Sequence, residues 1–137
     1  MKVETKSISV RTSHDHEYID VTEMLGEFVR KAGVKTGILS VFCPHTTAAV
    51  VIQESDSTIH KDTEDALKRL LPLDNRYRHD AEGPLNATAH IKDQLLGPSL
   101  SIPVRDGQLS LGYWQRVFFL ELCEARDRTL ELTLIGD

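Results

Sequence analysis

Two apolar runs that lie close together constrain the fold of this chain more than any other feature of its sequence. They cover Lys35–Phe42 and Thr47–Gln53 and are rich in β-branched and other apolar residues. Runs of this length and composition predict strands, and their nearly continuous apolar character is typical of strands inside a fold. The segment 43–46 between them is short enough for a hairpin, although Pro44 has no N–H and must then lie at a strand end.

Three further segments predict helices, because each carries apolar residues at helical spacing between a capping residue and a stop. The expected N-caps are Thr22 for the first helix, Ser55 or Asp56 for the second, and Asn86 for the third, which spans Ala87–Leu96. The stops are Gly33, Pro72 and Gly97-Pro98. Between the second and third helices lies a polar loop, residues 73–85, and loops of that length are often functional.

The remaining strands lie near the two ends of the chain. One is predicted over Lys6–Arg11, and a turn at His14–Tyr18 leads into a second, short strand. The last three are predicted over Ser99–Val104, Trp114–Cys123 and Thr129–Ile135, and a turn at Asp106-Gly107 separates the first two of these. Strands and helices do not alternate strictly. The prediction is therefore an α+β fold, a single compact domain over residues 1–137 with about three helices and a mixed or antiparallel sheet or sandwich.

Composition excludes some classes of function. The chain of 137 residues has 16 basic and 21 acidic residues and a net charge of −5, so its bulk field does not attract nucleic acid or anionic membranes. No apolar run approaches the roughly 20 residues needed to span a bilayer, and the N-terminus has no signal-peptide core. Cys43 and Cys123 each lie in an apolar run, which favours two reduced, buried thiols in a cytoplasmic protein.

The triplet His45-Thr46-Thr47 stands at the junction of the two apolar runs. A polar triplet is unusual for a core but natural for a site at a strand end. In the functional interpretation the imidazole is a ligand or an acid/base, and hydroxyl and amide donors beside it bind a phosphate oxygen. In the structural alternative the triplet is a hydroxyl-rich turn.

Two other histidines are candidates for the same site. His79 follows Arg76 and Arg78 in the polar loop, and arginine suits bidentate phosphate recognition, although a solvated loop is the alternative. His90 lies four residues after Asn86 on the predicted third helix, so the two share a face and could equally form a buried hydrogen-bonded couple. We expect the other three histidines, His14, His16 and His60, to be surface residues.

Together, His45, His79 and His90 match the usual requirement of an open metal site. Three imidazoles suit zinc or another transition metal better than magnesium, which prefers oxygen ligands, although a diphosphate substrate would bring magnesium into play. Acidic residues that could orient a ligand histidine are Glu54, Asp62 and Glu121. Because Glu121 stands in an apolar strand, it must either face water or be paired.

The segment before the penultimate strand also offers binding groups. Gly112 permits a bend, Trp114 is the only tryptophan, and Gln115 offers an amide for substrate contact. Trp114 could instead be a core or interface anchor. Arg126 and Arg128 bracket the last turn, where they either bind an anion or are simply solvated.

Several of these motifs, taken together in order, resemble the YjbQ family over nearly the whole chain, from Lys6 to Gly136. The resemblance is carried by Pro44–Ala49, Glu54, Asp62, Tyr77–His79, Asn86, Ala89-His90, Ile102–Val104, Gly107 and Leu111–Gln115. The family usually has threonine where this chain has Tyr113. Its basic run near the final turn is thinned here to Arg126-Asp127-Arg128.

The resemblance implies a homotrimer of compact α+β subunits, with sites near the subunit interfaces and a metal or anion site at His45, His79 and His90. It also implies a secondary thiamine-phosphate synthase activity, which joins hydroxymethylpyrimidine diphosphate to thiazole phosphate and releases pyrophosphate. The alternatives are a non-catalytic trimer that binds a metal or small anion, and another metal-assisted, hydrolytic enzyme.

On this reading the site takes a small phosphorylated substrate and a divalent metal, zinc before magnesium. The catalytic candidates are His45, Thr46, Thr47, Glu54 and Gln115. The substrate-binding candidates are Arg78, Asn86, Trp114 and Arg128. The metal candidates are His45, His79 and His90.

Overall fold

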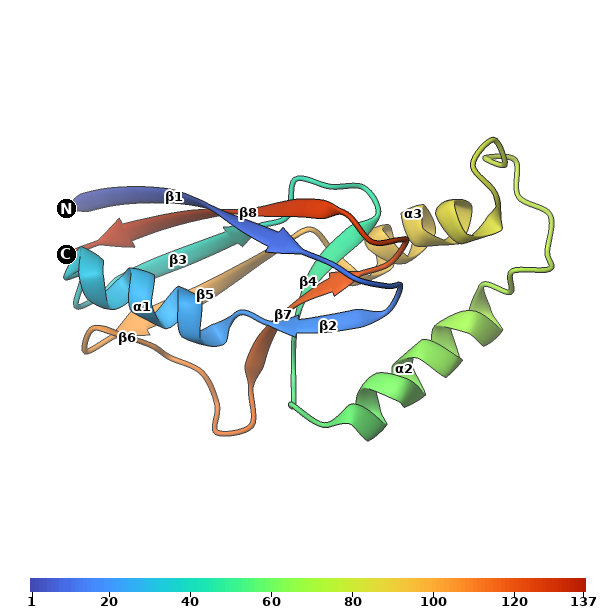
Figure 1. The fold of residues 1–137 in the computed structure, drawn as a ribbon. Helices are drawn as coiled ribbons and strands as arrows, with labels where there is room; N and C mark the ends of the chain where they lie inside the picture. The colour runs from blue at the N-terminus through green and yellow to red at the C-terminus, as the bar shows by residue number, and fades with distance from the viewer.

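The computed structural model describes residues 1–137 and has two antiparallel sheets and three helices, which confirms the predicted α+β class (Figure 1). The strands are β1 Lys2–Arg11, β2 Glu17–Asp20, β3 Gly37–Phe42, β4 Ala48–Gln53, β5 Ser99–Arg105, β6 Gln108–Leu109, β7 Arg116–Glu121 and β8 Asp127–Gly136. The helices are α1 Thr22–Ala32, α2 Ser57–Leu70 and α3 Pro84–Leu96.

The larger sheet has the strand order β1-β8-β3-β5-β6, and the smaller one has the order β2-β7-β4. β8 pairs with β1 along its whole length, but it pairs with β3 only from Gly136 to Glu131. The first residues of β8 therefore have a strand neighbour on one side only. The residues that fill the other side form part of the site described below.

The two apolar runs form strands as predicted, but the predicted hairpin between them is wrong. β3 pairs with β5 and β8 in the larger sheet, whereas β4 pairs with β7 in the smaller one. The chain therefore crosses from one sheet to the other between Phe42 and Ala48. This crossing is the feature of the fold that places His45-Thr46-Thr47 between the two sheets.

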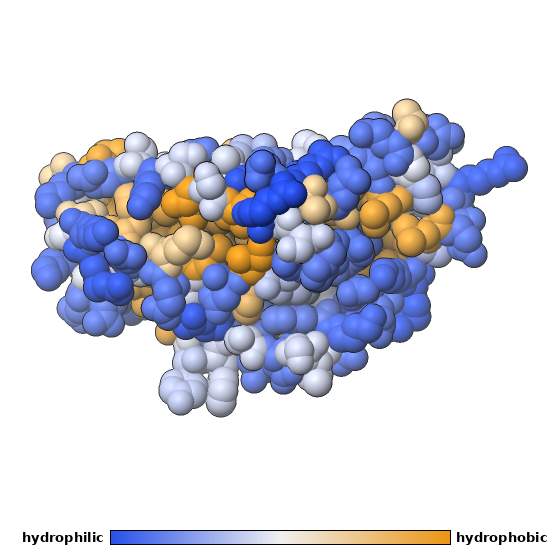
Figure 2. Space-filling view, in the orientation of Figure 1, coloured by the Kyte–Doolittle hydropathy of each residue, from blue (hydrophilic) through white to orange (hydrophobic).

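Buried side chains of both sheets form the main core, and α1 covers it with Leu25 and Val29. Burial alternates along β8, where Leu130, Leu132 and Leu134 point inward, as expected for a strand with one buried face. Figure 2 shows an apolar band over the middle of the molecule, between β1 and α1, surrounded by hydrophilic side chains. Partly buried residues of β1, β2 and α1 pack against the core: Ile8, Ile19 and Phe28.

The predicted capping residues are right for one helix and wrong for two. Asp56 caps α2 by accepting a hydrogen bond from the Thr58 N–H. Thr22 does not cap α1, because its hydroxyl accepts a hydrogen bond of 2.8 Å from the Val117 N–H of β7. Asn86 does not cap α3, which begins two residues earlier at Pro84 with Gly83 before it. Asn86 therefore lies inside the helix, with a buried side chain.

The strand predicted over Trp114–Cys123 is shorter in the structure. β7 starts at Arg116, because the segment before it forms a turn in which Gln115 Oε1 accepts a hydrogen bond of 2.7 Å from the Gly112 N–H. The turn at Asp106-Gly107 joins β5 to the two-residue strand β6, which was not predicted.

His16 is buried, and the prediction that it lies at the surface is wrong. Its side chain fills the turn before β2, where His16 Nε2 lies 3.0 Å from the Nζ of Lys92 on α3 and Nδ1 lies 2.8 Å from Asp15 Oδ2. Lys92 is itself fully buried. His60 is half-buried and stacks on Tyr18, with ring centroids 3.9 Å apart. Among the three, only His14 is exposed.

α2 and the loop after it extend away from the two sheets, whereas α3 lies against β4 (Figure 1). Leu67 is the only buried residue of α2. Both cysteines are buried and form no disulfide, as predicted. None of the helices is long and apolar enough to cross a membrane.

Candidate functional site

A polar cleft of about 330 Å³ lies where the chain crosses from β3 to β4, and no hydrophobic residue lines it. It combines the crossing, the start of α3 and the turn before β8. Its lining residues are Pro44, His45, Thr46, Thr47, Glu82, Asn86, His90, Arg126 and Arg128. Six of the predicted site residues thus meet in one place, although they are distant in sequence.

Arg128 is the charged group at the base of this cleft. It is only 4% exposed and forms a two-point ion pair with Glu121, with Nε 2.8 Å from Oε1 and Nη2 2.5 Å from Oε2. Nη2 also donates to the hydroxyl of Thr47 over 3.0 Å and to its carbonyl oxygen over 3.3 Å. Nη1 has no hydrogen-bond partner in the chain. It is the part of the guanidinium that remains for a ligand.

Glu121 is fully buried at the end of β7 and is held in its ionised form. Burial by itself raises the pKa of this carboxyl, but hydrogen bonds from Arg128, from the Thr12 hydroxyl and from the Cys123 N–H outweigh it and bring the pKa below its usual value. Glu121 was predicted either to face water or to be paired, and it is paired, with Arg128. Its charge offsets that of Arg128, so the cleft has a buried cation without a buried net charge.

The ring of His45 lies against the edge of β8 where β3 no longer pairs with it. His45 Nε2 lies 3.0 Å from the Thr129 nitrogen and 3.2 Å from the Thr129 oxygen. It therefore takes the place of a neighbouring strand for these two backbone groups. In either tautomer Nε2 is occupied, and Nδ1 is the nitrogen without a partner in the chain.

His45 is neutral near pH 7. Burial lowers its pKa first, and the nearby positive charge of Arg128 lowers it further, while the contact with the Thr129 backbone acts in the opposite direction. A neutral imidazole beside a buried guanidinium can exchange a proton with a ligand or accept a hydrogen bond from one.

α3 forms the opposite wall with Asn86 and His90, which lie one helical turn apart on the same face. Asn86 is 5% exposed, and its Oδ1 is buried without a hydrogen-bond partner. No hydrogen bond joins Asn86 to His90, so the structure does not show the alternative of a buried hydrogen-bonded couple. His79 does not line the cleft, but its ring packs edge-on against that of His90, with centroids 4.8 Å apart.

Within one chain, these histidines do not fit a three-nitrogen metal site. Ligand atoms of three or more histidine, cysteine or acidic residues come within 4.8 Å of one another only at Asp15, His16 and Glu64. There both nitrogens of His16 are already in contact with Asp15 and Lys92.

Besides His79, four candidates from the sequence lie outside the cleft lining. All four are exposed: Glu54, Arg78, Trp114 and Gln115. The Trp114 side chain is 67% exposed. The carbonyl oxygen of Glu54 lies 2.8 Å from His60 Nε2, and the Gln115 side chain closes its own turn. In one chain, none of these side chains contributes to the site.

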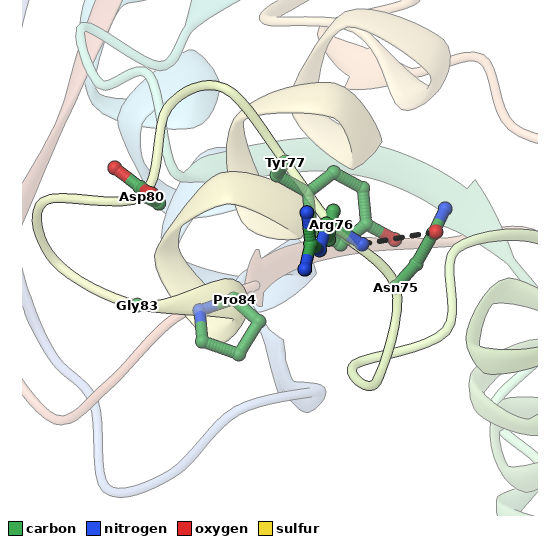
Figure 3. A pocket seen from close by; sticks show the side chains of 6 residues that line it. All are labelled: Asn75, Arg76, Tyr77, Asp80, Gly83 and Pro84. Carbon is green, nitrogen blue, oxygen red and sulfur yellow. Dashed lines mark hydrogen bonds between the residues drawn. The ribbon is translucent and has the colours of Figure 1, made fainter.

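A second hollow, of about 370 Å³, lies in the loop before α3 and is lined by Asn75, Arg76, Tyr77, Asp80, Gly83 and Pro84 (Figure 3). Asn75 Oδ1 accepts a hydrogen bond of 2.9 Å from the Arg76 N–H within it. None of its residues is buried. Exposed charges bind weakly in water, so the cleft with its buried ion pair is the better candidate.

Sequence reasoning missed three contributors to the site. Glu82 lines the cleft, Thr12 supports Glu121 through its hydroxyl, and Thr129 supports His45 through its backbone. Neither threonine stands in a recognisable motif, and a backbone contact depends on strand position and leaves no trace in residue type. Glu82 comes just before Gly83-Pro84, where α3 begins. This helix start was the only sequence signal that could have pointed to Glu82.

The family model and the related proteins that match this chain all carry the same family name. The family model described as "UPF0047 protein YjbQ-like" matches residues 6–137. The chain is 38% identical to a UPF0047 protein of Methanothermobacter thermautotrophicus over 136 residues, which are 99% of this chain and 94% of that protein. It is 32% identical to the UPF0047 protein YugU of Bacillus subtilis, over 96% of this chain and 98% of the relative.

Solved structures show the same fold. A crystal structure from Sulfolobus solfataricus, described as a YbjQ-like protein of unknown function, has a TM-score of 0.94 at 32% identity and covers 99% of both chains. An uncharacterised YjbQ/UPF0047 protein from Clostridium acetobutylicum has a TM-score of 0.89 at 37% identity, covering 95% of this chain and 99% of that one.

Proposed function

The chain belongs to the UPF0047 YjbQ-like family, and from this premise we propose that its cleft binds the phosphate group of a small substrate in a thiamine-phosphate synthase-like transfer reaction. The reaction would join hydroxymethylpyrimidine diphosphate to thiazole phosphate and release pyrophosphate. Both substrates carry phosphate groups, and the cleft offers donors that can bind phosphate oxygens.

The observation that carries the proposal is the arrangement around Arg128. Glu121 and Thr47 fix its guanidinium in place, and Nη1 has no partner within the chain. A guanidinium held in this way needs little further ordering to bind an anion, and arginine matches phosphate geometry well. Arg126 and the Thr46 segment line the same cleft and add donors.

The chain's own groups have distinct parts in this proposal. Arg128 and Arg126 bind phosphate oxygens and offset the charge that develops on departing pyrophosphate. His45, neutral near pH 7, is positioned to hold or release a proton through Nδ1. His90 faces it from α3. Zinc enters the proposal only as an ion that a bound phosphate or a second copy would help to hold, because one chain supplies no three-nitrogen cluster.

Phosphate binding is tested with the variant Arg128→Lys. Lysine keeps a positive charge beside Glu121 but loses the planar fork, so we expect pyrophosphate affinity, measured by titration calorimetry in EDTA, to fall about 10- to 100-fold. Arg105→Lys, an exposed site on β5, is the matched control and should bind like the wild type. Equal affinity in the two variants would remove Arg128 from the proposal.

The transfer reaction is tested separately with the two purified precursors. We expect thiamine phosphate to form with the wild type and to fall at least tenfold with His45→Gln. Pyrophosphate binding without any product would leave the second candidate, a non-catalytic anion-binding protein, which the same buried guanidinium supports. Added zinc or magnesium in parallel reactions shows whether a divalent ion is required.

A homotrimer and a cytoplasmic location also belong to the proposal. The outer face of the larger sheet supports assembly, since Ile38 and Ile135 are paired across β3 and β8 and are 54% and 45% exposed. They border an apolar hollow of about 380 Å³. We expect light scattering after gel filtration to give three times the mass of 15.4 kDa, and Ile38→Glu to reduce it. A monomeric wild type would contradict the assembly.

A further inference from the structure

We infer that His45 presents a hydrogen-bond donor, Nδ1–H, to the cleft, and that the cleft therefore recognises an oxyanion whose oxygens all accept, so that it takes sulfate or a sulfonate as well as an ionised phosphate. The inference rests on the proposed phosphate site and adds the chemical class of the group bound there. Its basis is the backbone of Thr129, which fixes the position of the proton on the imidazole ring.

Both backbone groups of Thr129 point away from β1. Opposite residues of an antiparallel pair of strands alternate between hydrogen-bonded and non-hydrogen-bonded pairs. The Thr12 N–H donates to the Arg126 oxygen over 3.0 Å, so these two residues form a bonded pair. Ser9 and Thr129 lie three positions further along the same register and form a non-bonded pair. The Thr129 N–H and carbonyl therefore face the side on which β3 would continue.

The strand β3 does not reach these two groups. Its last pair with β8 joins Phe42 to Glu131, so the position opposite Thr129 falls to Pro44, where the chain has already left the larger sheet. Proline also has no N–H to offer to a neighbouring strand. The ring of His45 takes this place instead, with Nε2 3.0 Å from the Thr129 nitrogen and 3.2 Å from its oxygen.

The two contacts of Nε2 exclude one another, because a ring nitrogen either accepts a hydrogen bond or donates one. An N–H without a partner away from water is rarer in proteins than a carbonyl oxygen without one, and the contact with the Thr129 nitrogen is also the shorter of the two. Nε2 therefore accepts, and the neutral ring carries its proton on Nδ1. In a protonated ring both nitrogens carry a hydrogen, so Nδ1 donates in either charge state.

Three donor atoms without a partner in the chain are open to the cleft. Asn86 Oδ1 and Asp93 Oδ1 are the only unpartnered side-chain nitrogen or oxygen atoms that are buried. His45 Nδ1, Arg128 Nη1 and Asn86 Nδ2 also have no partner, so they retain contact with solvent, and all three residues line the cleft. These donors come from the crossing, from β8 and from α3, and they converge on one hollow.

Glu82 is the one carboxylate that lines the cleft, and it lies at the rim. It is exposed in the loop before α3, where water screens its charge. The three donor atoms offer no acceptor to a ligand hydrogen. An anion whose oxygens all accept therefore loses nothing at these donors, whereas a hydrogen on the anion has to turn toward the rim.

The position of the proton is tested by nitrogen NMR of protein that carries labelled histidine rings, without any ligand. We expect Nδ1 of His45 to bear hydrogen and Nε2 to have the strongly downfield chemical shift of a nitrogen without hydrogen. The signals of His45 are those that disappear in His45→Gln. An Nδ1 without hydrogen would overturn the inference.

The ligand class is tested with sulfate and inorganic phosphate in titration calorimetry at about pH 8, where both are dianions and only phosphate carries a hydrogen. We expect wild-type affinity for sulfate to lie within about a hundredfold of that for phosphate. A site that accepts the hydrogen of its ligand rejects an analogue without it by about 10⁴-fold. A difference wider than a hundredfold would therefore overturn the inference.

The variant His45→Asp assigns the result to His45, because it replaces the donor by an acceptor. Phosphate can donate its hydrogen to the new carboxylate and sulfate cannot, so the ratio of the two affinities should shift at least tenfold toward phosphate. Since both anions carry the same charge, repulsion by the carboxylate cancels in this ratio. His14→Asp, at an exposed position, is the matched control and should keep the ratio. An unchanged ratio in His45→Asp would contradict a contact between His45 and the anion.

The outcomes separate this inference from the proposed function. If neither anion binds the wild type, the phosphate site itself is wrong, and the ligand class is wrong with it. If phosphate binds and sulfate is rejected, the phosphate site stands and the set of donors is wrong. The NMR measurement and the comparison of the two anions both use the wild type, so neither depends on the folding of a variant.

Discussion

At the scale of single residues, the buried pair of Glu121 and Arg128 connects stability with binding. The pair joins the end of β7 to the start of β8, and both side chains are at most 4% exposed. The net stabilisation from a buried ion pair is small, because desolvation offsets the attraction, but a single charge left without its partner is strongly unfavourable. The pair is therefore sensitive to loss of either member.

We expect Glu121→Gln to lower the free energy of unfolding by about 3–5 kcal/mol, because it leaves the Arg128 guanidinium buried and uncompensated. The double variant, Glu121→Gln with Arg128→Met, should lose less unfolding free energy than the sum of the losses in the two single variants. Urea denaturation of the four proteins measures both quantities. Additive losses would show that the two side chains act independently.

The same carboxylate predicts part of the acid sensitivity. The folded pKa of Glu121 lies below the reference value of 4.5, so its stabilising contribution is complete above about pH 4.5 and is lost as the pH falls through the folded pKa. We expect the unfolding free energy of the wild type to fall more steeply than that of Glu121→Gln between about pH 5 and pH 3. Parallel slopes would mean that Glu121 titrates alike in both states.

At the scale of elements, α3 is the helix that positions one wall of the cleft, and a buried polar contact anchors its far side. Lys92 Nζ meets His16 Nε2 at 3.0 Å across 76 residues of sequence. His16 also has a positive φ of 57°, which is unusual for a side-chain-bearing residue. The contact therefore holds together a strained turn and the amino group of Lys92, whose pKa is lowered by burial.

We expect His16→Ala to destabilise the protein by about 3–5 kcal/mol and Lys92→Met by only about 1–3 kcal/mol. The first leaves the buried amino group of Lys92 without its hydrogen-bond partner and also opens a cavity, whereas the second leaves only an unsatisfied imidazole nitrogen and keeps the volume of the side chain. Thermal and urea unfolding measure the order, with His14→Ala as an exposed control. The reverse order would mean that the Lys92 amino group does not depend on His16 as its partner.

The sequence predicted the types of the elements better than their partners. Composition and spacing identified β3, β4 and α2, because burial periodicity is local. Whether β3 and β4 share a sheet depends on β7 and β8, which lie more than sixty residues later, and so the hairpin prediction failed. The prediction that His16 is exposed failed for the same reason, because its burial depends on Lys92 of the distant helix α3.

The site followed a similar pattern. His45, Thr47, Asn86, His90 and Arg128 meet in the cleft, whereas His79, which was predicted with them, does not line it. The exposed candidates failed to join it because a motif in a loop does not specify where that loop lies. The support for His45 from the Thr129 backbone is invisible to any reading of residue types.

At the scale of the whole molecule, the packing is uneven. The two sheets, α1 and α3 form a continuous body, whereas α2 projects from it and buries only Leu67 (Figure 1). The apolar face of α2 leaves Leu70 64% exposed. A helix with so little tertiary contact relies mainly on its own hydrogen bonds, on its Asp56 cap and on salt bridges within the helix.

We expect the amides of α2 to exchange with deuterium at least a hundredfold faster than those of β3 and β8, because local opening of α2 exposes little apolar surface. Mass spectrometry of peptides from the monomeric and assembled protein measures this. Slow exchange of α2 only in the assembled protein would place a second copy on its apolar face. Slow exchange in the monomer would contradict the uneven packing.

The contact between His45 and β8 gives the molecule a natural spectroscopic probe. Since one imidazole nitrogen lies against the Thr129 N–H, any ligand that shifts the ring or its proton alters the magnetic environment of that amide. Occupancy of the cleft can thus be followed at a single backbone resonance in isotope-labelled protein, with no dye attached and before any turnover assay exists.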